Sequence, residues 1–127
     1  MAIQTFIDEL RDQTAGCELT AFGDLSAKLV LRSSAPSSIR REELDHLCET
    51  AAKSFNILKA IKTEESKLAE ETTQSVVCFS SDNIQAFTRF GDGLNDVVCA
   101  TVKAGGDPNT ALQNTQACAE KIAGVAE

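Results

Sequence analysis

The sequence predicts an α+β domain in which helices cover a single five-stranded antiparallel sheet. Segments with apolar residues three and four positions apart, typical of amphipathic helices, are interspersed with shorter segments in which apolar and polar residues alternate, as in strands. Their order is helix, two strands, long helix, three strands, helix, and short turns favour antiparallel pairing of consecutive strands. A length of 127 residues, of which 43% are hydrophobic and 24% charged, suits one domain spanning residues 1–127.

The first half of this pattern is a helix followed by a hairpin. The helix covers about residues 2–14, and its apolar stripe consists of Ile3, Phe6, Ile7 and Leu10. Strands Cys17–Phe22 and Ala27–Arg32 follow, joined by a tight turn at residues 23–26. In the second strand we expect Leu29 and Leu31 on the face opposite Lys28 and Arg32.

The long helix carries the strongest periodic signal in the chain. Ser37 or Ser38 is its expected N-cap. Its apolar face is formed by Leu44, Leu47, Cys48, Ala51, Phe55, Leu58 and Ile61. Residues 63–74 contain neither Gly nor Pro, and five of them are charged, so they either extend the helix or form a mobile acidic loop. We favour a helix that frays beyond about Lys67.

The second half is a three-stranded meander and a closing helix. The strands are expected at Ser75–Ser80, Ile84–Phe90 and Asp96–Val102. Asp107 caps the last helix, with Pro108 at its first position. Its apolar face is formed by Ala111, Leu112, Thr115, Cys118, Ile122 and Val125.

Charge and composition argue against several classes of partner. A net charge of −7 is unfavourable for binding nucleic acid or an anionic membrane. No apolar run approaches the roughly 18 residues of a membrane span. The first residues lack the basic region of a signal peptide, so we expect a cytoplasmic protein.

The sequence offers no convincing catalytic, cofactor or metal site. The five cysteines include no Cys-x-x-Cys pair, and His46 is the single histidine, so we expect reduced, mostly buried thiols rather than a metal centre. Asp92, Asn95 and Asp96 supply too few oxygens for calcium and suit a solvated turn. Asp107 would repel an anion at the start of the last helix. No phosphate-binding loop or nucleophile–base pair is present, so we expect no enzyme.

Basic residues cluster around the start of the long helix. Arg32, Arg40 and Arg41 lie close to Ser37 and Ser38 in the sequence. The simpler interpretation is a solvated turn, neutralised by the acidic residues at positions 42 and 43. The alternative is a docking point for an acidic partner or a phosphate.

The order of elements, over essentially the whole chain, resembles the roadblock family of dynein light chains and their bacterial and archaeal relatives. The features that carry the resemblance are the hairpin with Asp24 in its turn, the long helix with its leucine-rich stripe, the meander Val76–Val102 and the closing helix. Profilin-like and longin-like proteins share this architecture. The resemblance implies the strand order 2-1-5-4-3. It also implies a homodimer or roadblock-family heterodimer, without catalytic residues or cofactors, that acts as a scaffold or regulator of a Ras-like small GTPase. The alternative is a small-ligand sensor with a pocket between sheet and helices.

Two surfaces follow from the resemblance. With that strand order the third strand lies at the sheet edge, and the expected dimer interface is Ser75, Val76, Val77, Cys78 and Phe79. This segment has no charge or proline to prevent pairing. The expected partner surface is the outward face of the long helix, formed by Arg40, Arg41, Glu43, His46, Glu49 and Lys53. Plain solvation of these six residues is the competing interpretation.

Overall fold

The computed structural model describes residues 2–35, 40–61, 73–91 and 94–126. The elements, in chain order, are α1 (Ala2–Gln13), β1 (Cys17–Asp24), β2 (Leu29–Ser34), α2 (Arg41–Ile61), β3 (Thr73–Phe79), β4 (Asn83–Phe90), β5 (Asp96–Lys103) and α3 (Pro108–Ala126). The predicted type and order of these elements are confirmed. The expected N-cap at Ser37 or Ser38 and most of the segment 63–74 lie outside the described residues.

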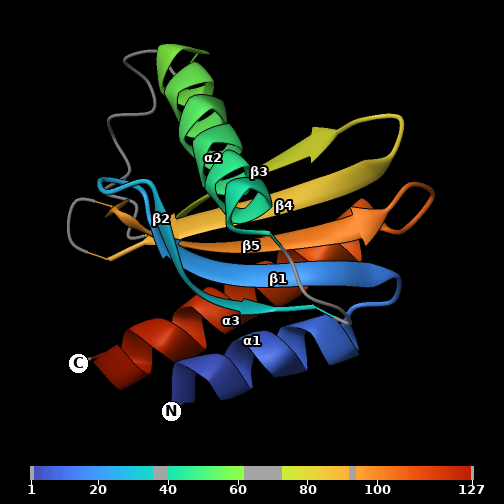
Figure 1. The fold of residues 1–127 in the computed structure, drawn as a ribbon, viewed down its shortest axis with the longest axis horizontal. Helices are drawn as coiled ribbons and strands as arrows, with labels where there is room; N and C mark the ends of the chain where they lie inside the picture. The colour runs from blue at the N-terminus through green and yellow to red at the C-terminus, as the bar shows by residue number, and fades with distance from the viewer. Residues whose placement is uncertain (1, 36–39, 62–72, 92–93, 127) are drawn as a thin grey trace.

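The strands form one five-stranded sheet in the order β2-β1-β5-β4-β3, with every neighbouring pair antiparallel. The predicted topology is therefore confirmed. Figure 1 shows three layers, with α2 crossing one face of the sheet and α1 and α3 lying side by side on the other. The edge positions belong to β2 and β3.

Alternation along the strands divides the core between the two faces. On the α2 face, Ala21, Phe87, Val97 and Cys99 pack with the apolar stripe of α2. On the other face, residues of the same strands, including Phe22, Phe90, Val98 and Ala100, pack with α1 and α3. Both faces of the three central strands are consequently buried, while each edge strand pairs on one side only with another strand of the described residues.

The bounds predicted for the second strand were wrong. The turn takes residues 25–28, and β2 begins at Leu29. The pairing register shifts between Phe22 and Gly23, which is the signature of a β-bulge. As a result Val30 is buried at 4% exposure, whereas Leu29 and Leu31 are 40% and 49% exposed.

The predicted start of α3 and the predicted environment of the thiols are confirmed. The Asp107 carboxylate accepts hydrogen bonds from the Asn109 N–H at 2.9 Å and the Thr110 hydroxyl at 2.7 Å, and Pro108 is the first helical residue. All five cysteines are free, three of them buried and two half-buried. None of the described helices is long and apolar enough to cross a membrane.

Candidate interaction surfaces

The β3 edge, defined as Ser75, Val76, Val77, Cys78 and Phe79, lies at the end of the sheet, as predicted. The Ser80 N–H donates to the Asn83 carbonyl at 2.9 Å, which makes these two residues a hydrogen-bonded pair. Such pairs alternate along an antiparallel ladder, and the β3–β4 register runs without a shift. Even-numbered residues of β3 therefore turn their backbone groups towards β4. Those of residues 73, 75, 77 and 79 point to the side away from β4.

The side chains of the β3 edge connect it with the core and with α2. Val76 and Cys78 are half-buried and pack against the core cluster under α2. The Cys78 thiol lies 3.1 Å from the hydroxyl of Ser54 on α2. Phe79 is 68% exposed, which is unusual for so large an apolar side chain.

A second contact between α2 and the edge strand is made through β4. The Arg89 guanidinium lies over the Phe55 ring, 4.7 Å from its centroid, and donates through Nε to the side-chain oxygen Oε1 of Gln74 at 2.8 Å. Its Nη2 group bonds to the same oxygen. Partial desolvation lowers the pKa of Arg89. These contacts fix the position of α2 relative to β3.

Ile57 is a surface residue that the sequence analysis missed. It follows Ser54 by three positions and so lies on the flank of α2 that faces β3, yet it is 62% exposed. The sequence feature that could have identified Ile57 as a surface residue is its position next to, but outside, the apolar stripe of the helix. Ile57 and Phe79 are both exposed near this edge, but Phe79 alternates with Cys78 onto the face opposite α2.

The α2 outer face, defined as Arg40, Arg41, Glu43, His46, Glu49 and Lys53, is exposed at all six positions. Arg40 lies just before the helix, and Arg41 and Glu43 lie on opposite flanks of its first turn. His46, Glu49 and Lys53 recur every three or four residues and point away from the sheet. This face carries both signs of charge.

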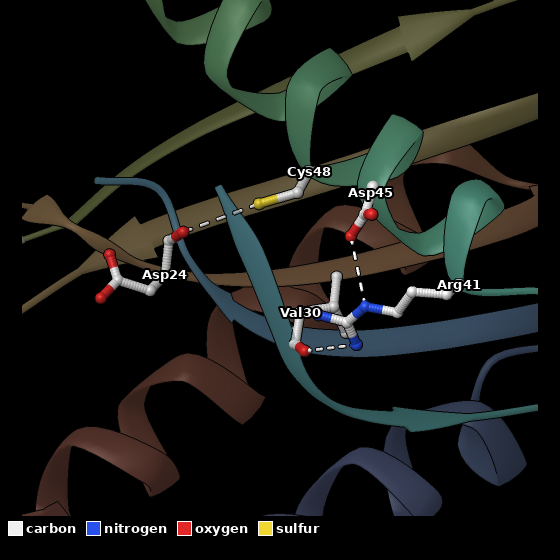
Figure 2. A network of polar contacts seen from close by, with 5 residues as sticks. All are labelled: Asp24, Val30, Arg41, Asp45 and Cys48. Carbon is white, nitrogen blue, oxygen red and sulfur yellow. Dashed lines mark hydrogen bonds and ion pairs between the residues drawn. The ribbon is translucent and has the colours of Figure 1, made fainter. Parts of the chain in front are cut away.

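Arg41 differs from the others because it also fastens α2 to the hairpin (Figure 2). Its Nη1 donates to the Val30 carbonyl at 3.1 Å, and its Nε lies 3.4 Å from Asp45 Oδ1, an ion pair without hydrogen-bond geometry. Both side chains of this pair are about half exposed, so it stabilises by at most about 1 kcal/mol. Close by, the Cys48 thiol donates to the Asp24 carbonyl at 3.7 Å.

The predicted basic cluster is divided between the two faces of the sheet. Arg32 pairs with Phe22, whose side chain packs with α1 and α3, whereas Arg41 lies on the α2 side. Asp45, one turn further along the helix, pairs with Arg41.

The two edges of the sheet differ in how open they are to another strand. β2 is bulged, carries the charge of Arg32, and has the Val30 carbonyl engaged by Arg41. All three features oppose further pairing. β3 has neither a register shift nor a charged side chain along Thr73–Phe79.

The pocket expected for a ligand sensor would lie between sheet and helices. One cleft in the described part of the chain lies between α1 and α3, lined on one side by Phe6 and Leu10 and on the other by Asn114 and Cys118, and it does not test that expectation. Its volume of about 30 Å³ compares with roughly 300 Å³ or more for typical ligand sites.

Comparison with known proteins establishes the fold. The sequence matches no protein-family model and no curated protein. The structure is similar to a Roadblock/LC7 domain from Streptomyces avermitilis, with a TM-score of 0.72, 8% identity, and coverage of 97% of this chain and 96% of that one. It is also similar to Myxococcus xanthus MglB, with a TM-score of 0.72, 11% identity, and coverage of 98% and 94%. A Schizosaccharomyces pombe profilin matches at a TM-score of 0.58 with 15% identity and 98% coverage of both chains. The predicted resemblance to roadblock proteins is confirmed at the level of the fold.

Proposed function

We propose that this chain is a non-enzymatic, dimeric interaction module that scaffolds or regulates a Ras-like small GTPase in the cytoplasm. The roadblock fold supports this class of function. The second subunit of the dimer is either another copy of this chain or a different chain with the same fold.

The observation that carries the proposal is the β3 edge. Its odd-numbered residues direct backbone N–H and C=O groups outwards, and an uncharged, unbulged edge is a template for another strand. Pairing there would also bring a second chain towards the exposed side chains of Phe79 and Ile57. The opposite edge, β2, is protected, so β3 is the favoured side for assembly.

We assign GTPase binding to the α2 outer face. It is accessible, and its mixed charges without a large apolar side chain suit a transient contact whose strength depends on salt. His46, Glu49 and Lys53 are the best candidates within it, because Arg41 is already engaged by Val30 and Asp45.

Titration of the native protein with Ras-like GTPases, each loaded with GDP or a GTP analogue, tests this assignment. The Lys53→Glu variant is expected to bind more slowly and with a changed salt dependence, since an exposed interface charge acts mainly on association. Lys103→Glu is the matched control, because Lys103 is exposed at the end of β5. If both variants bind a GTPase as the native protein does, the α2 outer face is not the binding site. If the native protein binds none of the GTPases, the proposed function itself is wrong.

A further inference from the structure

We propose that the β2 side of the molecule docks on an anionic lipid surface. The docking surface, called the basic β2 edge below, consists of Lys28, Leu29, Leu31, Arg32 and Arg40. β2 lies at one end of the sheet, with α2 on one face and α1 on the other (Figure 1). The proposal goes beyond the function proposed above and does not depend on it.

The charge of the chain is distributed unevenly along the sequence. Residues 25–41 contain four of the 12 basic residues and none of the 19 acidic ones. The four are Lys28, Arg32, Arg40 and Arg41, and all of them are exposed. The net charge of −7, which predicts no attraction to an anionic membrane, is therefore an average over a locally cationic edge and an acidic remainder. Acidic residues flank the segment at Asp24 and Glu42, which confines the cationic region to the edge itself.

Three of these four cations are available to a ligand. Arg41 already forms a hydrogen bond to β2 and an ion pair with Asp45. Lys28, Arg32 and Arg40 form no salt bridge with any residue that the structure describes. A ligand can therefore bind to these three side chains without displacing an internal partner.

Two leucines add an apolar contact between the cations. Leu29 and Leu31 belong to the few large apolar side chains that are exposed in the described part of the chain. The pairing register passes from Val30 to Arg32, so Leu31 has no partner on β1 and lies at the bulge. Apolar side chains beside basic ones are the combination by which amphipathic segments bind in the headgroup region of a bilayer.

The direction of the backbone groups in β2 follows from a hydrogen bond between two turns. The Leu25 N–H donates to the Asn95 carbonyl at 2.7 Å, so odd-numbered residues of β1 turn their backbone groups towards β5. Val30 and Ser33 both pair with odd-numbered residues of β1. Their carbonyls consequently point away from the sheet.

These outward carbonyls are already occupied by side chains of the two helices. Arg41 of α2 donates to the Val30 carbonyl at 3.1 Å, and Gln4 of α1 donates to the Ser33 carbonyl, also at 3.1 Å. An extended acidic peptide would therefore gain few backbone hydrogen bonds by lying along β2. A ligand of this edge has to bind through side chains.

The positions of the cations favour a broad anionic surface over a single acidic group. Arg32 pairs with Phe22, whose side chain packs with α1 and α3, whereas Arg40 precedes α2 on the other face. Cations on opposite faces of an edge strand do not converge on one carboxylate or phosphate, as a specific anion site requires. A plane of lipid headgroups laid against the edge meets both of them.

Co-sedimentation of the full chain with vesicles tests the proposal. Vesicles of phosphatidylcholine alone are compared with vesicles in which about one-third of the lipid is phosphatidylserine, at low and at high salt. We expect binding to the anionic vesicles only, and weaker binding at high salt because the ions screen the attraction. Each basic residue near such a surface strengthens binding roughly fivefold.

A double variant and a matched control locate the binding surface. Lys28→Gln with Arg32→Gln should bind the anionic vesicles roughly 30-fold more weakly than the wild type. Lys103→Gln with Lys121→Gln changes the net charge equally at exposed positions outside β2 and should bind like the wild type. Equal binding by the two double variants would overturn the basic β2 edge as the docking surface.

Two further measurements distinguish a lipid from a protein partner. Leu29→Gln with Leu31→Gln keeps the charge and should still weaken binding to the anionic vesicles, since both side chains are exposed and available for insertion. Failure of the wild type to bind anionic vesicles at low salt would overturn the proposal. If a glutamate-rich peptide binds under those conditions, the edge docks an acidic protein instead of a membrane.

Discussion

Two neighbouring proline substitutions should act on different equilibria: Val76→Pro should destabilise the monomer, and Val77→Pro should weaken the dimer. Proline lacks the backbone N–H, so its effect depends on where the replaced N–H points. The Val77 N–H points to the open side of β3, and the Val76 N–H points to Phe87 of β4. The two residues are otherwise matched in side chain and in half-burial.

The expected size of each effect follows from the bonds that are lost. Val76→Pro leaves the carbonyl of Phe87, a residue with 0% exposure, without its partner, which costs about 1–3 kcal/mol of unfolding free energy. Val77→Pro removes no bond within the chain. In a symmetric dimer it removes two intersubunit bonds worth about 0.5–1.5 kcal/mol each. Their combined loss of about 1–3 kcal/mol weakens the dimer roughly 5- to 150-fold.

Urea unfolding and light scattering over a concentration series measure the two effects separately. We expect Val76→Pro to shift the unfolding midpoint of the monomer and Val77→Pro to shift the monomer–dimer midpoint. Equal destabilisation of the monomer by both variants would refute the deduced direction of the backbone groups. A Val77→Pro protein that dimerises like the wild type would refute the β3 edge as the interface.

Three further predictions concern the core, the thiols and the start of α3. Phe55→Ala should lower the free energy of unfolding by about 3–5 kcal/mol, because it opens a cavity under α2 and removes the ring beneath Arg89; a loss below about 1 kcal/mol in urea would contradict this. Burial raises the pKa of Cys118 to about 11, so its alkylation at pH 8 should be far slower than that of a free thiol and should accelerate only as the pH approaches 11; rapid labelling of Cys118 by mass spectrometry at pH 8 would contradict its burial. Hydrogen bonds from Thr110 and Asn109 lower the pKa of Asp107, so the carboxylate stabilises α3 above its ordinary pKa of about 4 and loses this effect as the pH falls through the lowered value. Asp107→Ala should therefore melt earlier than the wild type at pH 7, and the difference should shrink in acid; a pH-independent difference would refute the role of the charge.

Most of the fold could be predicted from sequence because its signals are local. The stripe of α2, the turns and the proline at the start of α3 each depend on residues close together in the chain. The bounds of β2 could not be predicted in this way. Its bulge arises where Gly23 pairs with Val30, and an added Cβ at Gly23 would lie 2.8 Å from the Leu29 carbonyl. This close approach of two backbone segments does not change the pattern of apolar and polar residues, so the pattern could not predict it.

The candidate surfaces, like the fold, could be predicted from the sequence only where they depend on residues close together in the chain. Exposure of the α2 outer face follows from helical periodicity, but the bond from Arg41 to Val30 joins residues on separate elements and needs the folded structure. The edge position of β3 required the strand order, which came from the resemblance and not from the residues. The exposure of Ile57 depends on how far α2 lies from the end of the sheet, which the helix pattern alone does not specify.

Hydrogen exchange of the β3 amides as a function of protein concentration tests the central claim, that this edge is the assembly surface, most directly. The account predicts that the amides of Val76 and Cys78 are protected at every concentration, because they bond to β4. It predicts that the amides of Ser75 and Val77 are protected only at concentrations where the dimer forms, and that they exchange rapidly on dilution. Fast exchange of Ser75 and Val77 at all concentrations, in samples that remain dimeric, would contradict the claim.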